Sequence, residues 1–267
     1  MALERVAQDG LVLLGCGKMG TALLMGWLKA GVPAGSVWVI EPNPSDWLRA
    51  SGVHLNVGVP AAPAVALLAV KPQMMGAALP ALQALGNGTT LFVSIAAGTT
   101  IAAFEAALGD RTPIVRTMPN TPAMVNRGIT ALCRNAHVSE GDMALAVALM
   151  AAVGETVILE GEHQIDAVTA VSGSGPAYVF HLIEALAAAG EAEGLSPEVA
   201  MQLARATVCG SGELAHRSAD SAAQLRVNVT SPGGTTAAAL AVLMPELPGL
   251  MARAVKAAAD RGRELGK

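Results

Sequence analysis

The sequence is poor in aromatic residues and in charge. Of its 267 residues, 3% are aromatic and 14% are charged, whereas 52% are hydrophobic. Alanine fills 53 positions, so the core must be packed from small and aliphatic side chains. Global disorder is excluded, because it requires low hydrophobicity and high net charge, and the formal net charge is only −4. This length predicts one large domain or two smaller ones.

The sequence also lacks clustered positive charge, paired cysteines and paired histidines. A surface that follows nucleic-acid phosphates needs clustered lysine and arginine, which the sequence does not contain, so we expect no nucleic-acid partner. Cys16, Cys133 and Cys209 form no CxxC pair and predict neither a disulfide framework nor a metal site. The five histidines have no metal-binding spacing. A small molecule is therefore the expected ligand.

No hydrophobic run of the sequence predicts a membrane span. The longest stretch without a charged residue, 72–104, is interrupted by Pro80 and by the glycine and asparagine residues at 86–88. Near the N-terminus, Glu4 and Asp9 precede an apolar run that is too short for a signal peptide. We expect a cytoplasmic protein with no membrane partner.

Short apolar runs alternate with helical patterns through the first 160 residues. The runs of strand length are 11–14, 37–40, 65–70, 91–95 and 114–118, with later strands at 128–134 and 156–160. The helical patterns are 19–30, 45–50, 75–85, 101–108 and 140–153. Alternation of strands and helices predicts an α/β fold with a parallel, doubly wound sheet.

The character of the chain changes after residue 160. Residues 161–267 contain 24 alanines and two aromatic residues, and no strand pattern is evident. Helix start signals recur at Pro176, at Ser196 with Pro197, at Asp220 and at Thr235. We expect two domains, an α/β domain over 1–160 and an all-α domain over 161–267.

A glycine-rich turn follows the first predicted strand and opens a helix. It consists of Gly15, Cys16, Gly17, Lys18, Met19 and Gly20. In the GxGxxG fingerprint of Rossmann domains, the glycines allow a tight turn, close approach to a pyrophosphate and packing of helix on strand. The pattern predicts dinucleotide binding, and a purely structural glycine turn is the alternative.

Glu41 ends the next predicted strand, 21 positions after Gly20. A carboxylate there favours the ribose 2′-hydroxyl of NAD and repels the 2′-phosphate of NADP. The following residues, 42–45, contain no lysine or arginine, yet Asn43 and Ser45 are able to donate hydrogen bonds. The choice between NADPH and NADH therefore stays open, and a solvated charge at a strand end is the alternative for Glu41.

Three further loops follow strand ends, at 71–72, 96–98 and 119–122. Ligands of open parallel sheets bind at the carboxyl ends of strands, so these loops are expected to line one crevice. In the helical half, 172–176 and 230–236 place hydroxyls and glycines just before a helix, an arrangement that favours an anion such as a carboxylate. Because no strong acid–base pattern appears, we expect the cofactor to perform the chemistry.

Taken in chain order, six motifs resemble those of the pyrroline-5-carboxylate reductase family. They are GCGKMG at 15–20, AVKP at 69–72, SIAAG at 94–98, MPNTP at 118–122, SGSGPAY at 172–178 and SPGGTT at 231–236. The resemblance implies an N-terminal Rossmann-type dinucleotide-binding domain and a C-terminal all-α domain for dimerisation and substrate binding. It also implies homo-oligomers with a dimer as the minimal unit, often decamers.

The implied reaction is the last step of proline biosynthesis, in which NADPH or NADH passes hydride to C5 of L-1-pyrroline-5-carboxylate. By resemblance, the dinucleotide contacts are residues 15–20, Asn43, Asn56, Ala69, Val70, Lys71, Pro72, Ala96, Ala97, Gly98 and Asn228, in addition to Glu41. The substrate contacts are Glu162, Ser231, Thr235 and Thr236. Among these, Thr236 and Ser231 are the catalytic candidates, with Thr236 near the ring nitrogen. No metal is implied.

Two positions depart from the family pattern. Lys18 stands where Asn or Gln is common, and Ala222 with Ala223 replaces part of an HPGxLK motif. Other functions also remain possible on the residues alone: an NAD(P)-dependent reductase of another small imine or of a β-hydroxy acid, or a non-catalytic dinucleotide-sensing protein. A β-hydroxy acid dehydrogenase is disfavoured because it needs a catalytic lysine in the helical half, where only Lys256 and Lys267 occur, near the C-terminus. A non-catalytic dinucleotide sensor would not need the hydroxyls of SPGGTT.

Overall fold

The computed structural model describes residues 2–266 and divides the chain into two compact units. The first, here called the sheet unit, takes in Met1–Gly173 and Ala258–Lys267. The second, the helical unit, is Ser174–Ala257. This boundary is geometric, and the predicted division after residue 160 into a dinucleotide-binding and a dimerisation domain remains a prediction.

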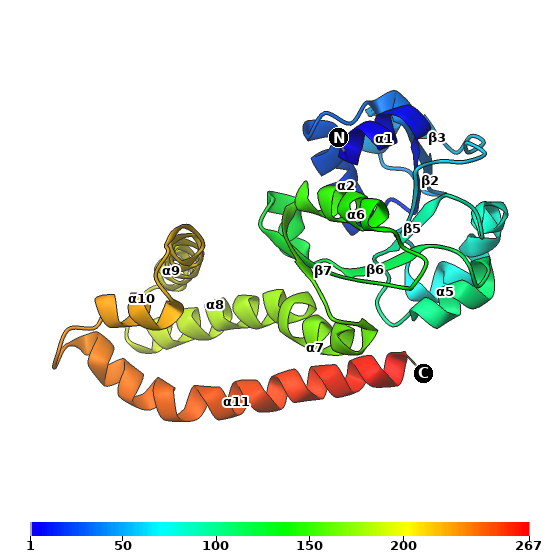
Figure 1. Ribbon diagram of the computed structural model, residues 1–267. Helices are drawn as coiled ribbons and strands as arrows, with labels where there is room; N and C mark the ends of the chain where they lie inside the picture. The colour runs from blue at the N-terminus through cyan, green and yellow to red at the C-terminus, as the bar shows by residue number, and fades with distance from the viewer. Residues whose placement is uncertain (1, 267) are drawn as a thin grey trace. The chain divides into compact units, whose positions relative to one another are not determined.

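The sheet unit is built on one eight-stranded sheet (Figure 1). Its strands are β1 (Leu11–Leu14), β2 (Val37–Ile40), β3 (His54–Leu55), β4 (Val65–Leu68), β5 (Leu91–Ser94), β6 (Ile114–Met118), β7 (Gly128–Arg134) and β8 (Gly154–Ile158). Their order is β3-β2-β1-β4-β5-β6-β7-β8, and β1 to β6 run parallel. The predicted parallel sheet is therefore confirmed for the part that holds the glycine-rich turn.

Helices cover both faces of this sheet. They are α1 (Ala2–Asp9), α2 (Lys18–Lys29), α3 (Asp46–Ala50), α4 (Met75–Ala78), α5 (Ile101–Leu108), α6 (Glu140–Ala151) and α7 (Ile165–Val168). Successive residues of β1 serve opposite faces: Leu11 and Leu13 pack with Trp27 of α2, whereas Val12 and Leu14 pack with Phe104 of α5. Burial on both faces explains why this strand reads as a continuous apolar run.

Three details of the sheet unit differ from the sequence prediction. Strand β7 runs antiparallel to β6, because only a short 3₁₀ segment, Thr121–Val125, connects them and no crossover helix intervenes. The predicted helix 75–85 continues beyond α4 as a 3₁₀ helix, Leu79–Leu85, where Pro80 lacks a backbone donor. Helix α1 and the two-residue strand β3 were not predicted.

The helical unit contains α8 (Gly175–Ala192), α9 (Pro197–Arg217), α10 (Ala222–Asn228) and most of α11 (Thr235–Leu265). The all-α prediction is confirmed. Ser196 caps α9 as expected, but Ser221 rather than Asp220 caps α10, with its Oγ accepting from the backbone of Gln224. The buried cluster of this unit consists of Ala187, Ala200 and Ala204.

Helix α11 is the one helix among residues 2–266 that is long and apolar enough to cross a membrane by length and composition. Its sequence pattern was not among those considered as a membrane span. None of its apolar window is buried, and the helix carries Pro245 and Pro248 in its interior. The apolar window of α11 is therefore not covered by the part of the chain that the structure describes.

Candidate functional site

The carboxyl ends of β1 and β4 lie side by side where the strand order reverses. Leu14 pairs with Leu68 in register, and the amide of Ala69 donates to the carbonyl of Leu14 at 2.8 Å. The chain leaves β1 toward β2 on one side, and β4 borders β1 on the other. Open α/β sheets bind ligands at this kind of switch point, so the turns 15–20 and 69–72 form the centre of the candidate site.

The three glycines of the turn have different geometric requirements. Gly15 has φ +89°, and a Cβ there would lie 2.8 Å from Val70 Cγ1. A Cβ on Gly20 would lie 2.8 Å from the carbonyl oxygen of Gly15, where helix α2 packs against the turn. Gly17, at the N-cap of α2, has open space around its missing Cβ. The turn thus leaves room for close approach of a pyrophosphate to the N-terminus of a twelve-residue helix, and these residues fit a dinucleotide.

The carboxylate of Glu41 is bonded to the protein backbone. Its Oε2 accepts from the amide of Cys16 at 2.8 Å, and its Oε1 accepts from the amide of Asn43 at 2.9 Å. The side chain of Asn56 brackets the Glu41 backbone, since its Oδ1 accepts from the Glu41 amide at 2.9 Å and its Nδ2 donates to the Glu41 carbonyl at 2.8 Å. The Glu41 carboxylate is therefore bonded to the backbone of two loops, and its contact with a ribose remains a prediction.

The predicted loops 69–72, 96–98 and 119–122 differ in the exposure and hydrogen bonding of their residues. Lys71 and Ala97 are exposed at the ends of their turns. Gly98 has φ +74°, and a Cβ there would lie 3.4 Å from the carbonyl oxygen of Leu265, at the end of α11. Asn120 is buried and bonded at both ends, donating to the Ser172 carbonyl and accepting from the Ile129 amide. Its side chain therefore joins segments of the fold.

Glu162 lies in the sheet unit and forms an ion pair that the sequence analysis missed. Its Oε1 lies 2.6 Å from Nη1 of Arg116, a side chain only 6% exposed, and also accepts from the amide of Ile101 at 2.8 Å. The only available signal was a charged residue inside the apolar strand β6. A groove of about 360 Å³ adjoins the pair, lined by Thr100, Arg116, Glu162, His163, Asp166, Arg263 and Gly266.

Two of the cysteines are buried thiols. Burial raises the pKa of Cys133 to about 11, Glu162 adds to the rise and Arg116 opposes it. Burial also raises the pKa of Cys16, against the hydrogen bond with Thr21. Both thiols are therefore protonated near neutral pH. Within residues 2–266, no three His, Cys, Asp or Glu side chains are grouped so that they could hold a metal ion.

The segment 231–236 presents hydroxyls at the beginning of α11. Gly233 has φ +70°, and the Gly234 amide donates to the Ser231 carbonyl at 3.0 Å. Ser231 and Thr235 are exposed and Thr236 is half-buried; none of their hydroxyls is bonded to another residue between 2 and 266. The first amides of a helix also lack intrahelical partners. Hydroxyls and amides together are suited to bind a carboxylate.

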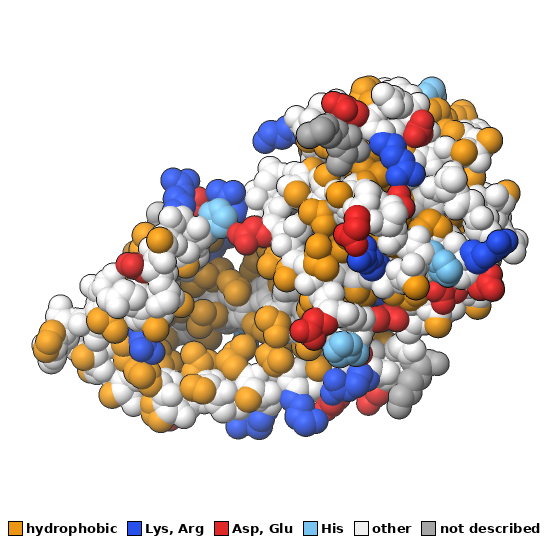
Figure 2. Space-filling view, viewed as in Figure 1, with side chains coloured by type: hydrophobic (Ala, Val, Ile, Leu, Met, Phe, Trp, Pro, Cys, Tyr) orange, Lys and Arg blue, Asp and Glu red, His pale blue; other side chains and the backbone are white. Residues whose placement is uncertain are grey.

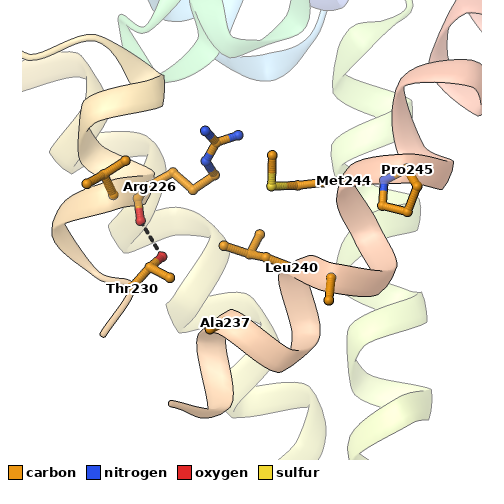
Figure 3. A pocket seen from close by; sticks show the side chains of 8 residues that line it. Arg226, Thr230, Ala237, Leu240, Met244 and Pro245 are labelled. Carbon is orange, nitrogen blue, oxygen red and sulfur yellow. Dashed lines mark hydrogen bonds between the residues drawn. The ribbon is translucent and has the colours of Figure 1, made fainter. Parts of the chain in front are cut away.

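An apolar groove of about 430 Å³ lies beside this segment, between α10 and α11 (Figure 3). Its lining residues are Arg226, Val227, Thr230, Ala237, Leu240, Ala241, Met244 and Pro245. The Thr230 hydroxyl donates to the Arg226 carbonyl at 2.6 Å, and the side chains of Arg226 and Met244 point toward one another across the groove. The groove is therefore mainly hydrophobic, with one guanidinium group.

Asn228 is engaged within its own part of the fold. Its Oδ1 accepts from Gln224 at 2.7 Å, and its Nδ2 donates to Asp220 at 3.2 Å. The contact of Asn228 with a dinucleotide remains a prediction. Ser172 is also engaged within the fold. Its hydroxyl was expected among the donors to an anion, but it donates to the Val168 carbonyl at 3.1 Å.

Comparison with known proteins gives matches across both units. Residues 162–265 match the model of the pyrroline-5-carboxylate reductase dimerisation family, and residues 11–98 match the NADP oxidoreductase, coenzyme F420-dependent family. Pyrroline-5-carboxylate reductase of Pseudomonas aeruginosa is 41% identical over 264 residues, which cover 96% of this chain and 97% of the relative. The chain belongs to the pyrroline-5-carboxylate reductase family.

Solved structures of this family have the same fold. The pyrroline-5-carboxylate reductase of Coxiella burnetii aligns with a TM-score of 0.90 at 36% identity, covering 97% of this chain and 99% of that one. The Plasmodium falciparum enzyme, solved with NADP bound, aligns with a TM-score of 0.82 at 30% identity, covering 97% and 98%. Membership of the family and the predicted fold class are both confirmed, and the family uses NAD(P)H.

Proposed function

We propose that this chain reduces L-1-pyrroline-5-carboxylate to L-proline with NAD(P)H, the final step of proline biosynthesis. The observation that carries the proposal is 41% identity to a pyrroline-5-carboxylate reductase over 96% of the chain. The aligned part of the chain includes both the glycine-rich turn and the hydroxyl segment 231–236. They supply the two binding functions that such a reaction needs.

In the proposed site, the bound dinucleotide supplies the hydride. The amides at the N-terminus of α2 would hold its pyrophosphate, for which Gly17 leaves room, and Glu41 would contact its ribose. The turns at 69–72 and 96–98 border the same end of the sheet, since they follow β4 and β5. These residues position the cofactor and take no part in bond changes.

The substrate carboxylate is proposed to bind at the beginning of α11. Ser231, Thr235 and Thr236 offer hydroxyls that have no partner among the described residues, and the helix terminus favours negative charge. Hydride adds to C5 of the protonated imine, the C=N double bond becomes single, and the nitrogen keeps its proton. Fixing the carboxylate limits the positions that C5 can take relative to the hydroxyls of this segment. Thr236 is proposed to orient the ring nitrogen, since a hydroxyl is too weak an acid to protonate it outright.

Glu162 has a different proposed contribution. Its carboxylate already accepts from Arg116 and from the amide of Ile101, so it fixes the beginning of α5 against β6. Any contact of Glu162 with substrate would have to share these bonds. We therefore propose that Glu162 supports the site by holding the end of the sheet in place, in addition to the substrate contact that the family resemblance implies.

A homodimer is the proposed minimal unit, and the cytoplasm is the proposed location. The matched dimerisation family spans 162–265, which includes the exposed apolar surface of α8 to α11. Figure 2 shows hydrophobic side chains over much of this surface. We propose that a second copy covers it, including the groove in Figure 3 and the apolar window of α11.

The assay mixes purified protein, NADH or NADPH and pyrroline-5-carboxylate, and follows nicotinamide absorbance while proline is measured. Proline formation with at least one cofactor is expected; no oxidation with either would contradict the proposal, and oxidation of a β-hydroxy acid instead would replace it. Thr236→Ala should lower kcat/KM about 10- to 100-fold, with unchanged dinucleotide affinity. The exposed Thr89 of the sheet unit provides the matched control, Thr89→Ala. Equal loss of turnover and dinucleotide binding in Thr236→Ala would mean that Thr236 is structural.

A further inference from the structure

We infer that Glu41 makes this chain prefer NADH over NADPH and that Asn56 is the positioning residue for its carboxylate. The inference rests on the proposed binding of a dinucleotide at the glycine-rich turn. It concerns the adenosine ribose, where the two cofactors differ by one phosphate. One relative was solved with NADP bound, and that name does not decide which cofactor this chain prefers.

The position of the Glu41 carboxylate is fixed by the backbone. It accepts from the amides of Cys16, inside the glycine-rich turn, and of Asn43, in the following loop. A dinucleotide whose pyrophosphate lies on this turn places its adenosine ribose at the end of β2, where Glu41 begins the loop. Two carboxylate oxygens offer about four acceptor sites, so acceptor capacity remains for ribose hydroxyls.

The surrounding loop offers no compensation for a 2′-phosphate. The Ser45 hydroxyl accepts from the Leu48 amide as the N-cap of α3, and the Asn43 amide is already donated to Glu41. Asp46, the first residue of α3, adds a second negative charge. No lysine or arginine occurs from 42 to 48, and the first, Arg49, stands in the last turn of α3. A phosphate at this position would meet the Glu41 carboxylate, with no lysine or arginine of the loop 42–48 to pair with it.

Asn56 holds this arrangement from the neighbouring strand end. Its backbone has φ +54°, an uncommon conformation for a residue other than glycine. In that conformation its amide group bonds both the amide and the carbonyl of Glu41. With both polar ends committed to the Glu41 backbone, Asn56 acts on the cofactor through Glu41. The variant Asn56→Gly tolerates the same backbone conformation but lacks the two side-chain hydrogen bonds to the Glu41 backbone.

Calorimetric titration of the full chain with ADP-ribose and with 2′-phospho-ADP-ribose tests the inference. We expect the wild-type chain to bind ADP-ribose at least about ten-fold more tightly. Glu41→Gln should reduce this ratio by about ten-fold or more, Asn56→Gly should reduce it by less, and Arg49→Gln should leave it unchanged. Thermal unfolding of each variant checks that it is folded. High salt should lower the affinity ratio of the wild-type chain, because screening weakens the repulsion between the Glu41 carboxylate and the 2′-phosphate.

Tighter or equal binding of the phosphorylated compound by the wild-type chain would overturn the inference. The inference would also be overturned if Arg49→Gln lost affinity for 2′-phospho-ADP-ribose alone, which would show that Arg49 pairs with the phosphate. An unchanged ratio in Asn56→Gly, with ADP-ribose affinity intact, would overturn the role of Asn56. Neither compound carries a nicotinamide, so the outcome is independent of proline formation and separates failure of this inference from failure of the proposed reaction.

Discussion

The sheet unit and the helical unit bury very different side chains. In the sheet unit, large residues such as Trp27, Phe92 and Phe104 are fully buried. In the helical unit, the buried cluster consists of three alanines, and Phe180 is 60% exposed. Full burial of a large apolar side chain contributes about 1.5–3 kcal/mol. The sheet unit thus has a core of its own, whereas the helical unit lacks one of comparable size.

This difference explains the composition of the chain. Alanine-rich helices pack closely, as α8 and α9 do where Gly190 meets Ala200, but alanines bury little surface. The larger side chains of α8 to α11 remain exposed in the single chain. Obligate interfaces resemble a core divided between two subunits, so the helical unit is expected to complete its core in an assembly.

The largest expected effect comes from charging this surface. The double variant Leu243→Glu with Met244→Glu places two carboxylates on half-exposed positions of α11. If a second copy covers them, burying unpaired charge is costly, and the dimer should dissociate with more than about 100-fold loss of turnover. Light scattering coupled to size-exclusion chromatography measures the mass.

The matched control is Arg253→Glu, which changes the charge by the same amount at a polar position of the same helix. It should retain the wild-type mass. A wild-type chain that is already a stable, folded monomer would contradict the comparison, as would a double variant with an unchanged mass.

A second prediction compares two phenylalanines, one from each unit. Phe104→Ala removes a fully buried ring and should lower the free energy of unfolding by about 3–5 kcal/mol at any protein concentration. Phe180→Ala should cost less, and its cost should vary with concentration if the ring is buried only in the dimer. Urea unfolding of each variant at two protein concentrations that differ about 100-fold measures both changes in unfolding free energy. A concentration-independent loss in Phe180→Ala would show that the ring stabilises the single chain.

The fold was predictable where local pattern and burial agree. Strands β1, β2 and β6 have the predicted bounds. β1 and β6 are almost wholly buried and read as apolar runs, and β2 is also continuously apolar although one face is only partly buried. Helix α5 also has its predicted bounds, with Thr100 as its N-cap. Helix α1 was missed because it is short and polar on one face. The direction of β7 was missed because it depends on the length of the connection and not on the strand itself.

The site was predictable only in outline. Spacing identified the glycine-rich turn, since each glycine meets a local steric requirement. The bonds of Glu41 to Cys16 and of Arg116 to Glu162 join residues 25 and 46 positions apart, and no local pattern records such contacts. The engagement of Asn228 with Gln224 and Asp220 likewise depends on side-chain geometry.

The smallest expected effect tests a charge contact inside the sheet unit, between α1 and α6. Asp142 lies 2.6 Å from Arg5; burial raises its pKa, but hydrogen bonds from Ser139 and Arg5 outweigh burial and hold it below the ordinary value of 3.8. A lowered pKa in the folded state stabilises the protein above the unfolded-state value, and this contribution disappears as pH falls through the folded value. Since Arg5 is 36% exposed, Asp142→Asn should cost no more than about 1 kcal/mol at pH 7.

The pH dependence distinguishes this contact from general surface charge. The difference in unfolding free energy between wild type and Asp142→Asn should be constant from pH 5 to 7, as an approximate window above the ordinary pKa of a carboxyl group, and should shrink below it. Glu140→Gln, which removes an 86% exposed partner of Arg134 on the same helix, should change stability by a few tenths of a kcal/mol at most, roughly at the limit of measurement. A difference that grows as pH falls would mean that the Asp142 carboxylate destabilises the folded sheet unit.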